Sequence, residues 1–178
     1  MNAPTVRLAE AADLPAVCEI VNHYIATTAI NFRTDPQTLA EWVADWTAFR
    51  ARYPWLVAVR DDRVVGLAHA GPFKPRAAYD WCAEVTVYVA PGEGRRGIGR
   101  RLYERLFERM DAQGFRSQVA VIALPNDPSV ALHEAFGFRH AGTLRGAGYK
   151  LGAWRDVGFW QRSAGVPDEP ARPLAAVT

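Results

Sequence analysis

The stretch from Glu84 to Arg101, read as EVTVYVAPGEGRRGIGRR, constrains the fold more than any other part of the sequence. Apolar and polar residues alternate over its first six positions, which predicts a strand with two different faces. One face carries Val85, Val87 and Val89, and the other carries Glu84, Thr86 and Tyr88. Pro91 and Gly92 then break the alternation, so we expect the strand to end there.

A turn rich in glycine and arginine follows this strand and precedes an expected helix. Its members are Gly92, Gly94, Arg95, Arg96, Gly97, Gly99, Arg100 and Arg101. Glycines let the backbone approach a ligand closely, and the free N–H groups of a helix N-terminus together with arginines favour a phosphate. The turn lacks the Lys-Ser/Thr ending of a P-loop and the acidic residue that follows a Rossmann fingerprint. We therefore predict a phosphate-binding turn of another kind.

Length and composition predict one globular domain. The 178 residues are 49% hydrophobic and include six Trp, enough for a substantial core. We expect the domain to span residues 1–163 and the Pro/Ala-rich tail, residues 164–178, to be disordered. The net charge of +2 does not indicate nucleic-acid binding, and no apolar run is long enough to cross a membrane. Two cysteines and four scattered histidines predict neither a disulfide framework nor a metal site, so we expect a cytoplasmic protein.

The remaining sequence alternates helical and strand patterns. We expect helices after Asp13, after Thr34 with Pro36 in its first turn, from Ile98 to about Gly114, and from Asn126 to Phe136. Strands are predicted on both sides of Asp61-Asp62, at residues 117–124, and in a final pair at residues 138–161. This order predicts an α/β domain of three layers around a mixed sheet.

Two motifs resemble the GNAT acetyltransferase superfamily. Arg95-Arg96-Gly97-Ile98-Gly99 is similar to its pyrophosphate-binding turn, Q/R-x-x-G-x-G/A, although Gly94 occupies the first position. The segment NDPSVALHEAFGF, residues 126–138, resembles its N-x-x-A-x-x-L-Y-x-x-x-G-F motif, with Ser129 and His133 at the small-residue and tyrosine positions. The resemblance implies a GNAT-like fold with a mostly antiparallel sheet and acetyl-CoA as co-substrate.

Stretches spread over the domain resemble the phosphinothricin N-acetyltransferase family more narrowly. They include IVNHYI, NFRT, RYPWLVA, AGPFKPRAAYDW, LPNDPSV and DVGFW. The family resemblance implies a homodimer that acetylates the amino group of a small amino acid, phosphinothricin (glufosinate) or else methionine sulfoximine or sulfone. Phe73, Pro75, Ala77 and Ala123 stand where the family has Trp, Ala, Asn and Gly. The alternative to an enzyme is a non-catalytic module that binds acyl-CoA.

The resemblance also implies which residues bind the cofactor and which carry the chemistry. The expected cofactor-binding residues are Val87, Tyr88, Val89, Arg95, Arg96, Gly97, Ile98, Gly99, Arg100, Asn126 and Ser129. Glu84 is our general base, since partial burial would raise its pKa; the alternative is a surface carboxylate paired with Lys74 or Arg76. His133 would protonate the CoA sulfur or share in deprotonating the amine. Asn126 can equally be a helix cap.

The loop ahead of the central strand supplies the expected acceptor site. Lys74, Arg76 and Tyr79 form a candidate clamp for an amino acid with two anionic groups, because Arg binds a carboxylate or phosphinate bidentately. The alternative is a mobile basic loop with no ligand. By resemblance, Phe32, Thr86 and Val157 complete the acceptor pocket.

Overall fold

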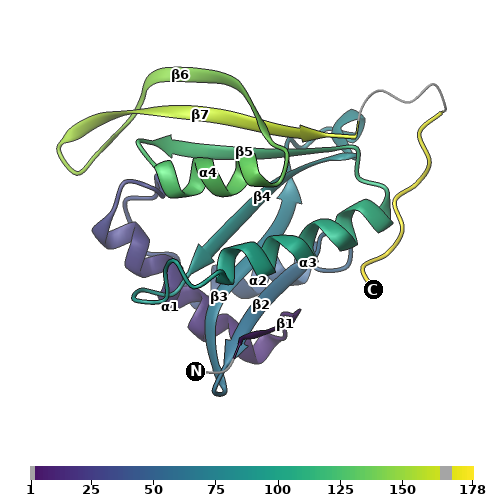
Figure 1. Ribbon diagram of the computed structural model, residues 1–178, viewed down its shortest axis with the longest axis horizontal. Coiled ribbons are helices and arrows are strands. Elements are labelled where there is room, and N and C mark those ends of the chain that lie inside the picture. The colour runs from purple at the N-terminus through teal and green to yellow at the C-terminus, as the bar shows by residue number, and fades with distance from the viewer. Residues whose placement is uncertain (1–2, 165–169) are drawn as a thin grey trace.

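The computed structural model describes residues 3–164 and 170–178, which fold around one seven-stranded sheet. The strands lie in the order β1-β2-β3-β4-β5-β7-β6 (Figure 1). Their bounds are β1 Thr5–Leu8, β2 Trp55–Arg60, β3 Arg63–Pro72, β4 Cys82–Val89, β5 Ser117–Leu124, β6 Arg139–Lys150 and β7 Ala153–Ser163. All neighbouring pairs are antiparallel except β4 and β5. The mixed, mostly antiparallel sheet that we predicted is confirmed.

Strands β4 and β5 pair only at one end. Their parallel register covers three residue pairs, from Cys82↔Ser117 to Glu84↔Val119, although both strands continue well beyond them. The two strands diverge after Glu84, as Figure 1 shows. The sheet is therefore split next to the glycine turn that follows β4.

Helices cover both faces of the sheet and produce the predicted three layers. Helices α1 (Leu14–Thr27) and α2 (Leu39–Phe49) cover one face, and α3 (Ile98–Gln113) and α4 (Asp127–Ala135) cover the other (Figure 1). The apolar stripe expected for α3 is buried and includes Ile98, Leu102, Leu106 and Met110. Two short 3₁₀ turns, Ala11–Asp13 and Ala77–Tyr79, complete the elements. Among the described residues, none of the helices has the length and apolar character of a membrane span.

The β2–β3 hairpin turns at Asp61-Asp62 as predicted. Both residues have positive φ, 49° and 57°, which is the backbone geometry of a two-residue turn that matches the twist of its strands. The predicted start of α2 was wrong. The helix begins at Leu39, where Thr38 accepts from the Glu41 N–H and Glu41 accepts from the Thr38 N–H.

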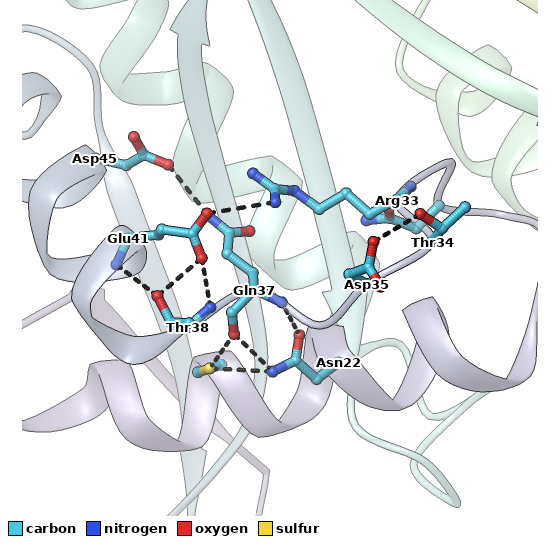
Figure 2. Close-up of polar contacts among 10 residues, drawn as sticks. Asn22, Arg33, Thr34, Asp35, Gln37, Thr38, Glu41 and Asp45 are labelled. Atoms are coloured by element: carbon cyan, nitrogen blue, oxygen red, sulfur yellow. Dashed lines mark hydrogen bonds and ion pairs between the residues drawn. The ribbon is translucent and has the colours of Figure 1, made fainter.

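The residues before α2 form an ordered loop, residues 28–38, in which the helix expected from Thr34 does not form. The Thr34 hydroxyl donates to Asp35 (3.0 Å), and Gln37 directs its side chain to Asp45 (3.2 Å), as Figure 2 shows. Both backbone groups of Gln37 are bonded by Asn22 of α1. Thr34 and Thr38 could each cap the start of a helix, and only Thr38 does so. The contacts of Gln37 with Asn22 hold the residues after Thr34 in a loop.

The tail expected to be disordered falls partly on residues 165–169, which lie outside the described residues. Residues 170–178 contain no helix or strand but contact the domain. Trp81 Nε1 donates to the Arg172 carbonyl (2.6 Å), and the Gln113 amide donates to the Ala175 carbonyl (2.9 Å). Leu174 packs against the core beside α3. This part of the tail thus lies against the end of α3, while the predicted boundary between domain and tail stays a prediction.

Candidate active site

A pocket of about 1000 Å³ lies where β4 and β5 separate. Residues from β3, β4, β5, β7, the glycine turn, α3, α4 and the loop before α2 line it. The predicted site residues that line it are Phe32, Glu84, Thr86, Val87, Tyr88, Val89, Arg95, Gly97, Ile98, Gly99, Arg100, Asn126, Ser129, His133 and Val157. The structure therefore brings together most of the residues predicted from separate motifs.

The glycine turn forms one end of this pocket. Gly97 is the N-cap of α3 with a left-handed φ of 74°, and no side chain caps the helix there. The first N–H groups of α3 can therefore bind a phosphate, and the helix dipole favours the negative charge. Glu93 pairs with both Arg60 of β2 and Arg96 (3.1 Å), which fixes the turn against the sheet. Arg96 itself is not among the residues that line the pocket.

Gly99 lies in the pocket between β4 and α4. A Cβ atom at this position would come within 3.3 Å of Leu132 Cδ2 on α4 and within 3.9 Å of the Val87 and Val89 side chains on β4. Its φ is not in the left-handed region, so the contact with Leu132, and not the backbone conformation, disfavours a larger residue here. The missing side chain keeps open the passage between β4 and α4.

The backbone of β4 presents hydrogen-bonding groups to the pocket. The Ala90 N–H donates to Val65 of β3 (2.9 Å), and backbone groups alternate between the two edges of a strand. The groups of Val87 and Val89 therefore point toward β5, which no longer pairs with β4 at this level. Tyr24 donates to the Val89 carbonyl (2.7 Å). An extended ligand with amide groups can bond to this edge as a strand would.

Asn126 and Ser129 lie on the α4 side of the pocket. Asn126 is the N-cap of α4, and its side chain accepts from the Ser129 N–H at 3.4 Å. The capping role considered from the sequence is therefore present. Both residues also line the pocket, so the cap and a ligand contact are compatible.

Glu84 stands where β4 and β5 begin to separate. Glu84 lines the pocket, and its register partner on β3 is Gly71, which has no side chain to cover it. Burial raises the pKa of Glu84, and the positive charge of Lys74 partly opposes this. A carboxylate with a raised pKa is a stronger base, as a proton-accepting role requires.

His133 is buried, and both of its ring nitrogens have partners. Nδ1 lies 2.7 Å from the Ser129 carbonyl, so it carries the proton, and Nε2 then accepts from the Tyr103 hydroxyl at 2.8 Å. Burial lowers the pKa of His133, while the bond to Ser129 opposes the shift; burial also raises the pKa of Tyr103. Both groups are therefore neutral near pH 7, and His133 has no N–H directed at the pocket.

The predicted acceptor residues divide into two groups. Phe32, Thr86 and Val157 line the pocket. Lys74, Arg76 and Tyr79 are exposed on the loop between β3 and β4 and do not line it. This loop is ordered by ring contacts: Tyr79 meets Phe73 edge to face at 5.7 Å, and the Lys74 ammonium lies 5.3 Å from the Phe73 ring. The candidate clamp is thus at the rim of the pocket.

Sequence reasoning missed several aromatic residues that line the pocket. His69 of β3 stacks on Trp55 at 4.3 Å and is the register partner of Thr86, and Trp42 meets both rings edge to face. All three residues line the pocket. Burial lowers the pKa of His69 to about 4, so it is neutral at physiological pH. No sequence motif indicates that His69 belongs to the site. Its place beside Thr86 follows only from the pairing of β3 with β4.

Comparisons with known proteins agree with this geometry. Residues 6–158 match the model of the acetyltransferase (GNAT) domain family. A phosphinothricin N-acetyltransferase of Streptomyces viridochromogenes is 58% identical over 97% of this chain and 94% of its own length. An L-methionine sulfoximine/L-methionine sulfone acetyltransferase of Pseudomonas aeruginosa is 34% identical over 88% and 92% of the two chains. The crystal structure of a phosphinothricin acetyltransferase from Sinorhizobium meliloti with acetyl-CoA superimposes with a TM-score of 0.92, at 33% identity over 97% and 96%.

The chain therefore belongs to the GNAT acetyltransferases and, among them, to the phosphinothricin N-acetyltransferase family. The family resemblance noted in the sequence is confirmed.

Proposed function

We propose that this protein transfers the acetyl group of acetyl-CoA to the amino group of phosphinothricin. The observation that carries the proposal is the position of Glu84, which lies where β4 and β5 separate and lines the same pocket as the N-terminus of α3 and the aromatic rings around His69. The 58% identity to a phosphinothricin N-acetyltransferase supports this acceptor. A binding module without chemistry would have no need of a carboxylate in this position.

Acetyl-CoA would lie along the split between β4 and β5. The N-terminus of α3 would hold its pyrophosphate, and the open edge of β4 would bond its amide-containing arm. An N–H of Val87 or Val89 would then polarise the thioester carbonyl and stabilise the negative charge that develops on its oxygen. These roles use backbone groups and the shape of the cleft.

Glu84 would accept the proton that leaves the acceptor ammonium, directly or through a water molecule. An α-amine has a pKa near 8, so neutralising it at pH 7 costs about 1.4 kcal/mol, yet the proton must have a destination. The free amine would attack the thioester carbon; as the tetrahedral adduct collapses and the C–S bond breaks, the nitrogen would give up its second proton and become an uncharged amide nitrogen, and that proton balances the one that the sulfur takes up. The thiolate then takes a proton. For this step His133 would need to change tautomer or to act through the Tyr103 hydroxyl.

The rim loop would select the acceptor by charge. Lys74 and Arg76 can approach the distal anion of phosphinothricin, while Phe32 and Val157 would contact its aliphatic part. Methionine sulfoximine or sulfone is the second candidate acceptor. The similarity to the Pseudomonas aeruginosa enzyme favours it.

A cytoplasmic homodimer is the assembly that we propose. Large apolar side chains are exposed along the β6–β7 hairpin, where isolated domains usually present polar residues. They are Leu144, Tyr149, Leu151 and Trp154, the last with 71% of its surface exposed. A second copy of the chain covering this hairpin would bury them.

Release of CoA thiol from acetyl-CoA tests the proposed reaction. Phosphinothricin, methionine sulfoximine, methionine sulfone and a basic peptide are compared at equal concentrations. We expect the largest kcat/KM with phosphinothricin and no thiol release with the peptide. Acetyl-CoA binding by calorimetry without thiol release from any acceptor would instead identify a binding module.

A further inference from the structure

The loop of residues 28–38 carries Phe32 to the acceptor side of the pocket and is fixed at its distal end by α1. The Asn22 amide donates to the Gln37 carbonyl (2.9 Å), and the Gln37 N–H donates to the Asn22 side-chain oxygen (2.8 Å), as Figure 2 shows. The Cys18 thiol also donates to this carbonyl (3.2 Å). The Asn22 side chain thereby forms hydrogen bonds with both the N–H and the carbonyl of Gln37, as the backbone of a neighbouring strand would.

The end of the loop next to Phe32 is bound by Lys150, the last residue of β6. Its ammonium donates to the carbonyls of Ile25 and Asn31, both at 2.7 Å, and the residue is only 7% exposed. The Ile25 carbonyl belongs to the last turn of α1, where carbonyls lack helical partners and the helix dipole is negative. Burial lowers the pKa of Lys150. A buried ammonium requires such partners, so Lys150 joins β6 firmly to the loop.

Gly148 lies two residues before Lys150 on β6 and contacts the loop through the ring of Phe32. A Cβ atom at Gly148 would collide with Phe32 Cε2 and lie 2.8 Å from its Cδ2. The φ of Gly148 is not in the left-handed region, so the ring, and not the backbone conformation, requires a glycine here. The phenyl ring thus occupies the place that a side chain on β6 would take.

We propose that Gly148 and Lys150 form a seat on β6 that positions Phe32 in the pocket and thereby determines the affinity for the amino-acid acceptor. Neither residue lines the pocket, so both are positioning residues that act through Phe32 and Asn31. The inference rests on the proposed function in one respect, namely that this side of the pocket binds the acceptor. It adds that β6, which supplies no pocket residue within the described structure, takes part in acceptor selection.

Gly148→Ala tests the seat, with Gly142→Ala as the matched control on the same strand. A Cβ at Gly142 meets nothing within 4 Å, and its φ is also outside the left-handed region. Because overpacking moves the ring, we expect Gly148→Ala to raise KM for phosphinothricin at least about fivefold, with kcat and the acetyl-CoA dissociation constant changed less than about twofold. Gly142→Ala should leave all three nearly unchanged. Equal KM values for the two variants would overturn the proposal.

The double variant Phe32→Ala/Gly148→Ala tests whether Gly148→Ala changes KM by displacing the Phe32 ring. With the ring absent there is nothing to displace, so Gly148→Ala should add less than about twofold to the KM of Phe32→Ala. An undiminished effect of Gly148→Ala in that background would show that it acts by another route and would refute the seat.

Lys150→Met gives a readout that does not depend on the acceptor. Hydrogen exchange of the peptide spanning residues 28–38, followed by mass spectrometry, should be faster than in wild type by about tenfold or more, while Gly142→Ala leaves it unchanged. Unaltered exchange in a folded Lys150→Met variant would contradict the proposal. If exchange rises but wild type acetylates no amino acid, the seat stands and the proposed function fails, so the two failures are distinguishable.

Discussion

The two halves of the pocket are built in different ways. The half that we propose for the cofactor is formed largely by backbone groups from neighbouring elements, namely the edge of β4, the glycine turn and the first turn of α3, with Asn126 and Ser129 of α4 beside them. The half that we propose for the acceptor is formed by side chains from distant segments, such as Phe32, His69, Glu84 and Val157. A contiguous sequence motif can specify the cofactor half. The residues of the acceptor half are far apart in the sequence and come together only when the sheet forms. The two halves should therefore respond differently to substitution.

Substitution of Glu84, which stands between the halves, should have the largest effect. General acid–base catalysis contributes about 100- to 10,000-fold, so Glu84→Gln should lower kcat by that range at pH 7 with acetyl-CoA affinity nearly unchanged. Only the ionised carboxylate accepts a proton, and burial raises its pKa, so the wild-type rate should rise as Glu84 ionises. The variant should instead recover as pH approaches the amine pKa near 8, since more amine is then neutral.

His133→Ala is compared with Glu84→Gln and with wild type. The turnover of all three enzymes is measured with saturating acetyl-CoA from pH 6 to pH 9.5. We expect a smaller loss than for Glu84→Gln, because the Nδ1 proton is engaged by Ser129 and the ring contacts Tyr103. Near-normal turnover by Glu84→Gln together with a severe defect in His133→Ala would make His133 the base.

Gly99→Val should affect the cofactor half selectively. The new side chain would fill the passage between Leu132 and β4, so acetyl-CoA affinity should fall about tenfold or more, the equivalent of roughly 1.4 kcal/mol. Gly99 is a better choice than Gly97, whose φ of 74° would strain a valine and disturb the start of α3. Calorimetry measures the affinity, and circular dichroism checks the fold. Unchanged binding in a folded variant would exclude the turn from the site.

Arg76→Ala should have the smallest effect and should be confined to the acceptor half. Arg76 is exposed at the rim, where a charge pair contributes about 0.2–1 kcal/mol, so KM for phosphinothricin should rise about 1.5- to 5-fold. KM for methionine sulfone should change less, because this acceptor lacks the second anion. Arg105→Ala, on the exposed face of α3, serves as control. Equal changes for both acceptors would show that Arg76 holds their common carboxylate or only shapes the loop.

The difference between the halves also explains how far the sequence could predict the site. The strand, turn and helix around Gly97 follow each other directly, and local periodicity was sufficient to place them. The start of α2 was misplaced because Asn22, fifteen residues earlier, holds Gln37 in a loop conformation. His69 was missed because its position depends on the register of β3 with β4. Long-range pairing leaves no signature in a single sequence, so the acceptor half was predicted mainly by family resemblance.

The open edge of β4 bears on how such an enzyme can change during evolution. A ligand bonded by the N–H and C=O groups of a strand is largely indifferent to the side chains that the strand carries. Acceptor-facing residues can then be exchanged while the cofactor remains bound, so new acceptors become accessible by single substitutions. For protein engineering, the residues to randomise are the side chains around Phe32 and His69, while the backbone path from Val87 to Gly99 is kept.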